Sequence, residues 1–220
     1  MTKLCNAAGC SKPVIYGELC TLHTLRKGNM GHVDLVPITR KEVRQYRTTI
    51  EREMIRTRVA GDIEEYFNQM MEEQRAIVAE MNKRGCGHLD AYYAALDFVD
   101  AVGDKDRQVL LDLMGLGWLM QLDQDRLPNP EAIALTATKV LRWSLVKGAK
   151  RSMRKSGQID VSKRKLSRSA KRHLGNILVP TLVSFGYAMC KTFVEHEKAQ
   201  GDLKRGIMGK ITNGGTEAQD

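Results

Sequence analysis

The sequence predicts an all-α protein with a small cysteine-rich segment at its front. Beyond residue 39, apolar residues recur every three or four positions, which is the period of an amphipathic helix, and no strand-like alternation appears. Glycine and proline signals divide this region into about five helical runs. Three of the five cysteines lie in the first 20 of the 220 residues, so we expect that end to fold differently.

The front segment carries three cysteines and a histidine in the pattern C-x4-C-x9-C-x2-H, formed by Cys5, Cys10, Cys20 and His23. A structural zinc ion takes four thiolate or imidazole ligands. Cys20 and His23 are three residues apart, so both fall on one face of the first turn of a helix. Residues 1–30 are therefore predicted to form a zinc knuckle stabilised by bound Zn²⁺. His32 is a poorer alternative to His23, because it lies further on, in a glycine-containing connector.

Within the knuckle, Val14 to Tyr16 followed by Gly17 predicts a short hairpin with its turn at the glycine. The other interpretation of the segment is a flexible arm with unpaired thiols. Four ligand-type residues within 19 positions favour the metal site.

Residues 31–38 are predicted to form a connector, and residues 39–200 a helical domain. Thr39 followed three positions later by Glu42 is typical of a capping box at a helix start. The helical period then runs to about Lys83 with one weak point at Ala60-Gly61, so we expect one long helix or two nearly continuous ones.

The remaining helices are predicted from their boundaries. Asn129 and Pro130 have the form of an N-cap and a first helical residue, and Pro180 is expected to kink or split the last helix. The predicted helices span residues 89–102, 105–122, 130–155 and 162–198. Residues 201–220 show no apolar period and are predicted to form a flexible tail.

The net charge of +9 conceals two opposite regions. Residues 51–138 carry 17 acidic and 9 basic side chains, whereas residues 139–172 carry 13 basic side chains against Asp160 alone. On a helical wheel of about 100° per residue, Leu166, Ala170, Leu174 and Leu178 share a face that would hold the last helix on the core. The cations of that helix then point outward, where they would repel one another, so a negatively charged partner is expected.

Phosphate is the obvious complement of this segment, because each cation that meets a phosphate adds salt-sensitive, largely sequence-independent affinity. Aromatic residues make up only 5 %, so stacking platforms for single strands are few and duplex DNA is the favoured ligand. The predicted nucleic-acid-binding residues are Lys12, Arg26, Lys27, Lys150, Arg151, Arg154, Lys155, Lys163, Arg164, Lys165, Arg168, Lys171 and Arg172. An acidic protein partner and a solvated helix face are the alternatives. An anionic membrane is disfavoured, because the core needs the apolar face.

The segment CNAAGCSKPVIYGELCTLH resembles the small Cys3His zinc motif of phage and bacterial HNH-type homing endonucleases and related DNA-binding proteins. The resemblance covers about 25 residues and implies an accessory DNA-binding or structural module. The histidine and asparagine set of the nuclease centre is absent, so nuclease activity does not carry over. A fainter likeness links residues 129–134 to a helix of single-subunit phage RNA polymerases, whose polymerase motifs are missing here.

These patterns predict a non-enzymatic, zinc-containing nucleic-acid-binding protein, acting as a phage-type accessory or regulatory factor of transcription or replication. The alternative is a protein-interaction factor that binds or inhibits a polymerase or another enzyme, with a purely structural zinc site. We find no phosphate-cradling glycine loop or nucleophile elbow, so no catalytic residues are predicted. Clustered cysteines without an export signal indicate the cytoplasm, which is the host cytoplasm for a phage protein.

Overall fold

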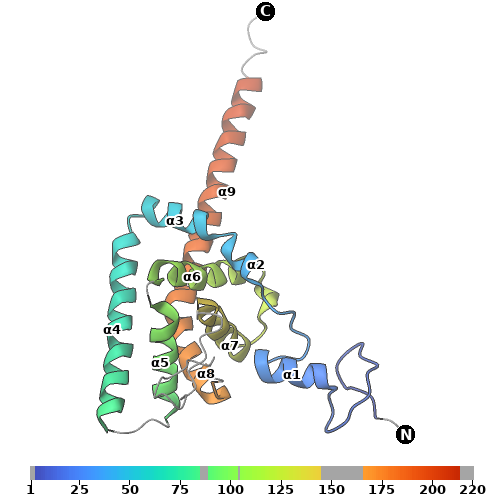
Figure 1. Cartoon of the computed structure of the whole chain (residues 1–220). Coiled ribbons are helices and arrows are strands. Elements are labelled where there is room, and N and C mark those ends of the chain that lie inside the picture. Colours follow the sequence, from blue (N-terminus) through green and yellow to red (C-terminus); the bar gives the residue numbers. More distant parts are fainter. Residues whose placement is uncertain (1–2, 85–88, 104, 145–165, 214–220) are drawn as a thin grey trace, which may run out of the picture.

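The computed structural model describes residues 3–84, 89–103, 105–144 and 166–213, which fold as an all-α protein with a cysteine-containing N-terminal segment (Figure 1). The α-helices are α1 Thr21–Met30, α2 Arg40–Arg44, α3 Arg47–Arg56, α4 Ala60–Arg84, α5 Asp90–Val102, α6 Asp106–Leu122, α7 Pro130–Leu141, α8 Arg168–Leu178 and α9 Ser184–Asn213. Short turns of helix are η1 Gln124–Arg126, η2 Arg142–Ser144 and the π-helical η3 Val179–Val183. Within the described ranges, β-pairing is limited to one isolated bridge, in the N-terminal segment.

Helix α6 is the centre of the fold. Every residue from Val109 to Leu119 is buried, as expected of a helix that is apolar nearly all round. It packs against α9, α7, α2 and α3, and Figure 1 shows it crossing between α3 and α7. The charged residue of the buried stretch, Asp112, pairs with Arg44 at 3.2 Å and Arg47 at 2.7 Å, so its carboxylate is compensated.

Glycines let α6 come into backbone contact with η3 and α9. A Cβ placed on Gly117 would lie 1.9 Å from the Val183 carbonyl oxygen, and one placed on Gly186 would lie 2.1 Å from that of Met114. Gly175 of α8 meets Ala134 of α7 in the same way, with 2.4 Å to the Ala134 oxygen. Only a residue without a side chain fits at these crossings.

The predicted run from residue 39 to 83 is divided more often than expected. The capping box is confirmed, since the Thr39 side chain accepts from the Glu42 amide and Glu42 accepts from the Thr39 amide. The prediction of one long helix or two nearly continuous ones was wrong, because the segment forms three helices, α2, α3 and α4. The second break contains Arg58 at a φ of 59°, the left-handed region. The breaks turn the chain around α6, so that Arg44 and Arg47 both reach Asp112.

The last helical run stays continuous through Pro180. A five-residue π-helical segment contains this proline, which lacks an N–H and could not extend a regular α-helix. Helix α8 begins at Arg168 rather than near residue 162, because Ser167 accepts from the Ala170 amide as N-cap. Helix α7 ends at Leu141, earlier than predicted, and residues 145–155 lie outside the described ranges.

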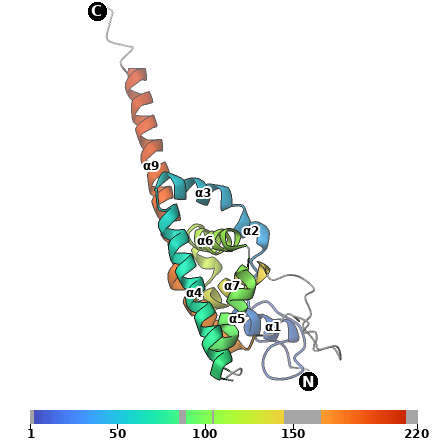
Figure 2. The ribbon, with the colours of Figure 1, turned by 60° about the vertical axis from the view of Figure 1, so that its left-hand side comes forward.

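Helix α9 continues to Asn213, past Gly201, where the sequence predicted the tail to begin. Its last turns extend away from the other helices in both views (Figures 1 and 2). Leucine, lysine, arginine and methionine in this stretch have favourable helix propensities, which explains a helix without an apolar period. Residues 214–220 lie outside the described ranges.

By length and composition alone, the run Arg168–Gly201 is apolar enough to cross a membrane. Its inward side chains, among them Leu174, Leu178 and Cys190, are fully buried against the rest of the protein. The predicted apolar face of α8 is confirmed by the burial of Leu166 and Ala170 as well. One face of this run therefore belongs to the core of the fold.

Candidate metal centre

Short backbone pairing shapes the segment before α1. The Cys5 amide donates to the Lys12 carbonyl and the Val14 amide to that of Lys3, at 3.1 and 2.9 Å. The predicted hairpin was therefore wrong in its partner, because residues 12–14 pair with residues 3–5 and not across Gly17. Gly17 does form a turn, with a φ of 77°, a value that favours glycine. The pairing holds Cys5 in place, and a turn in which the Cys10 amide donates to the Ala7 carbonyl at 3.1 Å positions Cys10.

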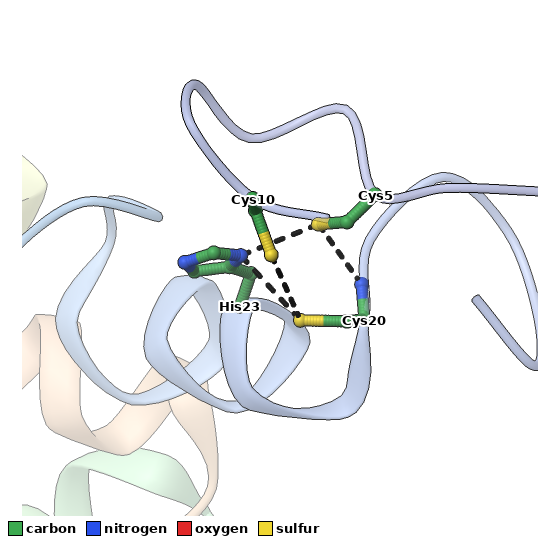
Figure 3. Close-up of side chains that lie close together, drawn as sticks. All are labelled: Cys5, Cys10, Cys20 and His23. Carbon is green, nitrogen blue, oxygen red and sulfur yellow. Dashed lines mark hydrogen bonds between the residues drawn. The ribbon is translucent and has the colours of Figure 1, made fainter. Parts of the chain in front are cut away.

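Helix α1 supplies the other two ligand-type residues. Cys20 is its N-cap residue, in extended conformation, and His23 follows in the first turn as predicted. Gly31 caps the end of the helix in the left-handed conformation, with a φ of 75°. Its backbone N–H donates a hydrogen bond to the Lys27 carbonyl. A tight start and a tight end leave a helix of ten residues with its first turn facing Cys5 and Cys10 (Figure 3).

Cys5, Cys10, Cys20 and His23 converge on one point, with all four ligand atoms within 4.8 Å of one another. The His23 Nδ1 atom lies 3.3 Å from the Cys5 Sγ and 3.5 Å from the Cys20 Sγ, and the Cys10 and Cys20 Sγ atoms are 3.9 Å apart. In a zinc tetrahedron with Zn–S bonds of about 2.3 Å, neighbouring ligand atoms are about 3.6 to 3.8 Å apart. The group can hold a metal ion such as zinc with little rearrangement.

The group is shielded from water. Cys5, Cys20 and His23 are buried, Cys10 is half-buried, and Ala7, Val14, Leu19 and Val33 complete an apolar cluster separate from the main core. In the connector that follows α1, His32 accepts a hydrogen bond from the Asp34 amide. Among the described residues, His23 and not His32 joins the cysteines.

Hydrogen bonds favour the ionised form of the Cys5 thiol. Burial raises the pKa of the Cys5 thiol, but hydrogen bonds from the Cys20 and Ala7 amides and from the His23 and Cys20 side chains outweigh it, lowering the pKa to about 6. The Cys20 amide lies 3.2 Å from the Cys5 Sγ. A thiol that ionises readily is the form that ligates metal. The Lys12 amide lowers the pKa of the Cys10 thiol, but burial and the neighbouring Cys5 and Cys20 thiols together outweigh it and raise that pKa.

The predicted phosphate contacts divide into three groups. Lys12 and Lys27 are exposed on the knuckle and Arg26 is half-buried. Seven predicted residues lie outside the described ranges: Lys150, Arg151, Arg154, Lys155, Lys163, Arg164 and Lys165. Arg168, Lys171 and Arg172 lie on α8. None of these assignments is tested by the fold, so all remain predictions.

The α8 cations are less free than the helical wheel predicts. Arg168 and Arg172 both donate to the Oε1 atom of Glu131, with Nη2–Oε1 distances of 2.8 and 2.6 Å. Burial and the charges of Arg142 and Arg168 lower the pKa of Lys171, which is half-buried rather than directed outward. One carboxylate against two guanidinium groups still leaves one positive charge in excess.

Glu131, at the start of α7, lies between the zinc knuckle and the basic residues of α8. The sequence alone did not single it out. A Cβ on Gly31, at the end of α1, would lie 3.1 Å from both the Glu131 Cγ and the Ala132 amide nitrogen. The knuckle helix therefore ends against the residue that holds the α8 arginines. An acidic residue in a first helical turn is commonplace, so no sequence signal marked this role.

Comparison of the chain with protein-family models, with curated proteins and with solved structures finds no match.

Proposed function

We propose that this chain is a non-enzymatic, zinc-containing protein that binds nucleic acid, with duplex DNA as the favoured ligand. The zinc ion would be held by the four converging ligands Cys5, Cys10, Cys20 and His23. Because the protein supplies all four ligands, the ion has no open position for a reacting group and acts structurally, by holding the knuckle folded.

The observation that carries the binding proposal is the meeting of the two basic regions at Glu131. The end of α1 packs on this residue, and Arg168 and Arg172 reach it from α8. Cations of the knuckle and of residues 139–172 would then act on the same duplex. The Arg168 and Arg172 side chains remain 43 % and 52 % exposed, so their unused N–H groups are accessible to phosphate oxygens.

The acidic region of residues 51–138 supports binding of nucleic acid at the end of the protein that carries α1 and α8. Asp62, Glu65 and Glu73 are exposed on α4, whereas the knuckle contacts α7 at another part of the fold (Figure 1). Phosphates would be repelled from α4 and drawn to the end that carries α1 and α8. This polarity, together with the resemblance of the knuckle to a phage DNA-binding motif, supports an accessory role in transcription or replication within the cytoplasm.

The test is fluorescence anisotropy with a labelled 20-base-pair duplex at increasing salt, on the zinc-loaded protein. We expect affinity that falls steeply with salt, and an Arg168→Gln/Arg172→Gln variant that binds about tenfold more weakly with a shallower salt dependence. The matched control is Arg75→Gln, which removes an exposed α4 arginine paired with Glu72. A parent protein that does not bind the duplex near physiological ionic strength would exclude the proposal. Equal binding by parent and double variant would exclude the α8 contacts.

A further inference from the structure

An apolar groove lies between the start of α4 and the junction of η3 with α9. Its volume is about 330 Å³. One wall is formed by Val59, Asp62, Ile63 and Tyr66, and the other by Pro180, Thr181, Leu182 and Phe185. The groove is distant in sequence from the metal ligands and the proposed phosphate contacts.

The groove has a fixed floor and two aromatic rings at its rim. Ile63 and Leu182 are 4 % and 1 % exposed, so they belong to the core and would not move aside. Tyr66 and Phe185 are 47 % and 40 % exposed, one on each wall. Aromatic side chains left partly exposed beside an apolar groove are typical of a protein-interaction surface.

Acidic side chains border the α4 wall. On a wheel of about 100° per residue, Glu73 and Asp62 lie about 20° and 40° from Tyr66 and Glu65 lies about 100° from it. Asp62 lines the groove itself, and Glu73 and Glu65 lie beyond it on the same helix. None of the three is in an ion pair with any residue that the structure describes. The other acids of this helix differ, since Glu64 pairs with Arg107 and Glu72 with Arg75.

We propose that this groove docks a basic amphipathic helix of another protein. Bulky apolar side chains of that helix would insert between Tyr66 and Phe185, and its lysines or arginines would pair with Asp62, Glu65 and Glu73. Apolar anchors at three- and four-residue spacing are how a helix fills such a groove. Charge complementarity selects this partner, because the acidic border repels nucleic acid and acidic segments. The interaction does not depend on the proposed function of the basic end.

The test is a selection from a display library of 16-residue peptides against the full-length, zinc-loaded protein, with affinities of synthetic winners measured by titration calorimetry. We expect winners rich in lysine or arginine, with apolar residues at helical spacing. Tyr66→Ala and Phe185→Ala are each expected to weaken binding about tenfold, as at other aromatic anchors. A Glu65→Lys/Glu73→Lys variant should bind weakly and lose the salt dependence. The matched control Glu197→Lys, an exposed change on α9, should bind as the parent does.

Circular dichroism of each variant checks that the helical fold is retained, which these exposed positions allow. Neutral or acidic winners, or winners that bind Tyr66→Ala and Phe185→Ala like the parent, would overturn the proposal. Sedimentation of the parent tests the competing occupant, a second copy of this chain, whose residues 139–172 are also basic. A dimer that Tyr66→Ala dissociates would assign the groove to self-association and would overturn a foreign partner.

Discussion

The Nη2 atom of Arg172 lies 2.6 Å from the Oε1 atom of Glu131, the same oxygen that accepts from Arg168. This carboxylate neutralises one of the two charges that α8 offers to a ligand. The Glu131→Gln variant is therefore expected to bind duplex DNA about fivefold more tightly, with a steeper salt dependence. Anisotropy titrations at several salt concentrations measure both. Glu72→Gln, which removes the acid of an exposed α4 pair, should change neither, and unchanged affinity in Glu131→Gln would mean that phosphates do not contact these arginines.

Metal content tests the knuckle directly. The protein should carry one zinc ion per chain, and His23→Ala should lose it because one of four ligands is gone. His32→Ala is the matched control and should retain the metal, since its side chain bonds the Asp34 amide outside the ligand group. Elemental analysis of the purified variants gives the result. A metal-free parent, or loss of metal in His32→Ala alone, would contradict the assigned ligands.

Chelation is expected to unfold the knuckle and leave the helical body folded. Cys5, Ala7 and Cys20 form an apolar cluster separate from the main core, too small to remain folded without metal. Hydrogen exchange with and without chelator should show lost protection in residues 3–30 and unchanged protection in α6. Loss of protection in α6 would show that the two parts unfold together.

The capping box at the start of α2 should make the free energy of unfolding depend on pH in the acid range. Hydrogen bonds from Thr39 and the charge of Arg126 outweigh burial and hold the pKa of Glu42 below its ordinary value. A lowered folded-state pKa contributes stability above the unfolded value of about 4.3, and this contribution is lost as the pH falls through the folded value.

Glu42→Gln should therefore lower the free energy of unfolding by about 1 kcal/mol at pH 7, as for other lost caps. The difference from the parent should vanish at acid pH, where Glu42 is also uncharged. Urea denaturation at a series of pH values measures it. A difference that stays constant with pH would show that the charge of Glu42 is not involved.

The glycine crossing of α6 and α9 predicts a large stability loss. Gly117→Ala places a methyl group 1.9 Å from the Val183 carbonyl oxygen, so the helices must separate, at a cost of about 3 kcal/mol or more. Gly61→Ala is the control, because a Cβ there meets no atom within 4 Å and alanine favours the helix. Thermal and urea unfolding of the two variants compare them. Equal stability would mean that the crossing is looser than described.

The sequence by itself determined the features that depend on near neighbours. The capping box at Thr39 and the N-cap at Asn129 were predicted, because each is set by residues three positions apart. The group of Cys5, Cys10, Cys20 and His23 was predicted as well, because its four ligand types lie within one short segment of the sequence. The helical period placed α5 and α6 within a residue of their observed starts. Local geometry and local hydrogen bonds carry this information.

Only the tertiary structure decided what depends on contacts between distant residues. The left-handed break at Arg58 follows from wrapping the chain around α6, and the close approach at Gly117 requires α9 on the other side. Glu131 holds Arg168 and Arg172 across 37 and 41 residues of sequence. No local pattern records which carboxylate meets which cation, because that choice is made when the helices pack.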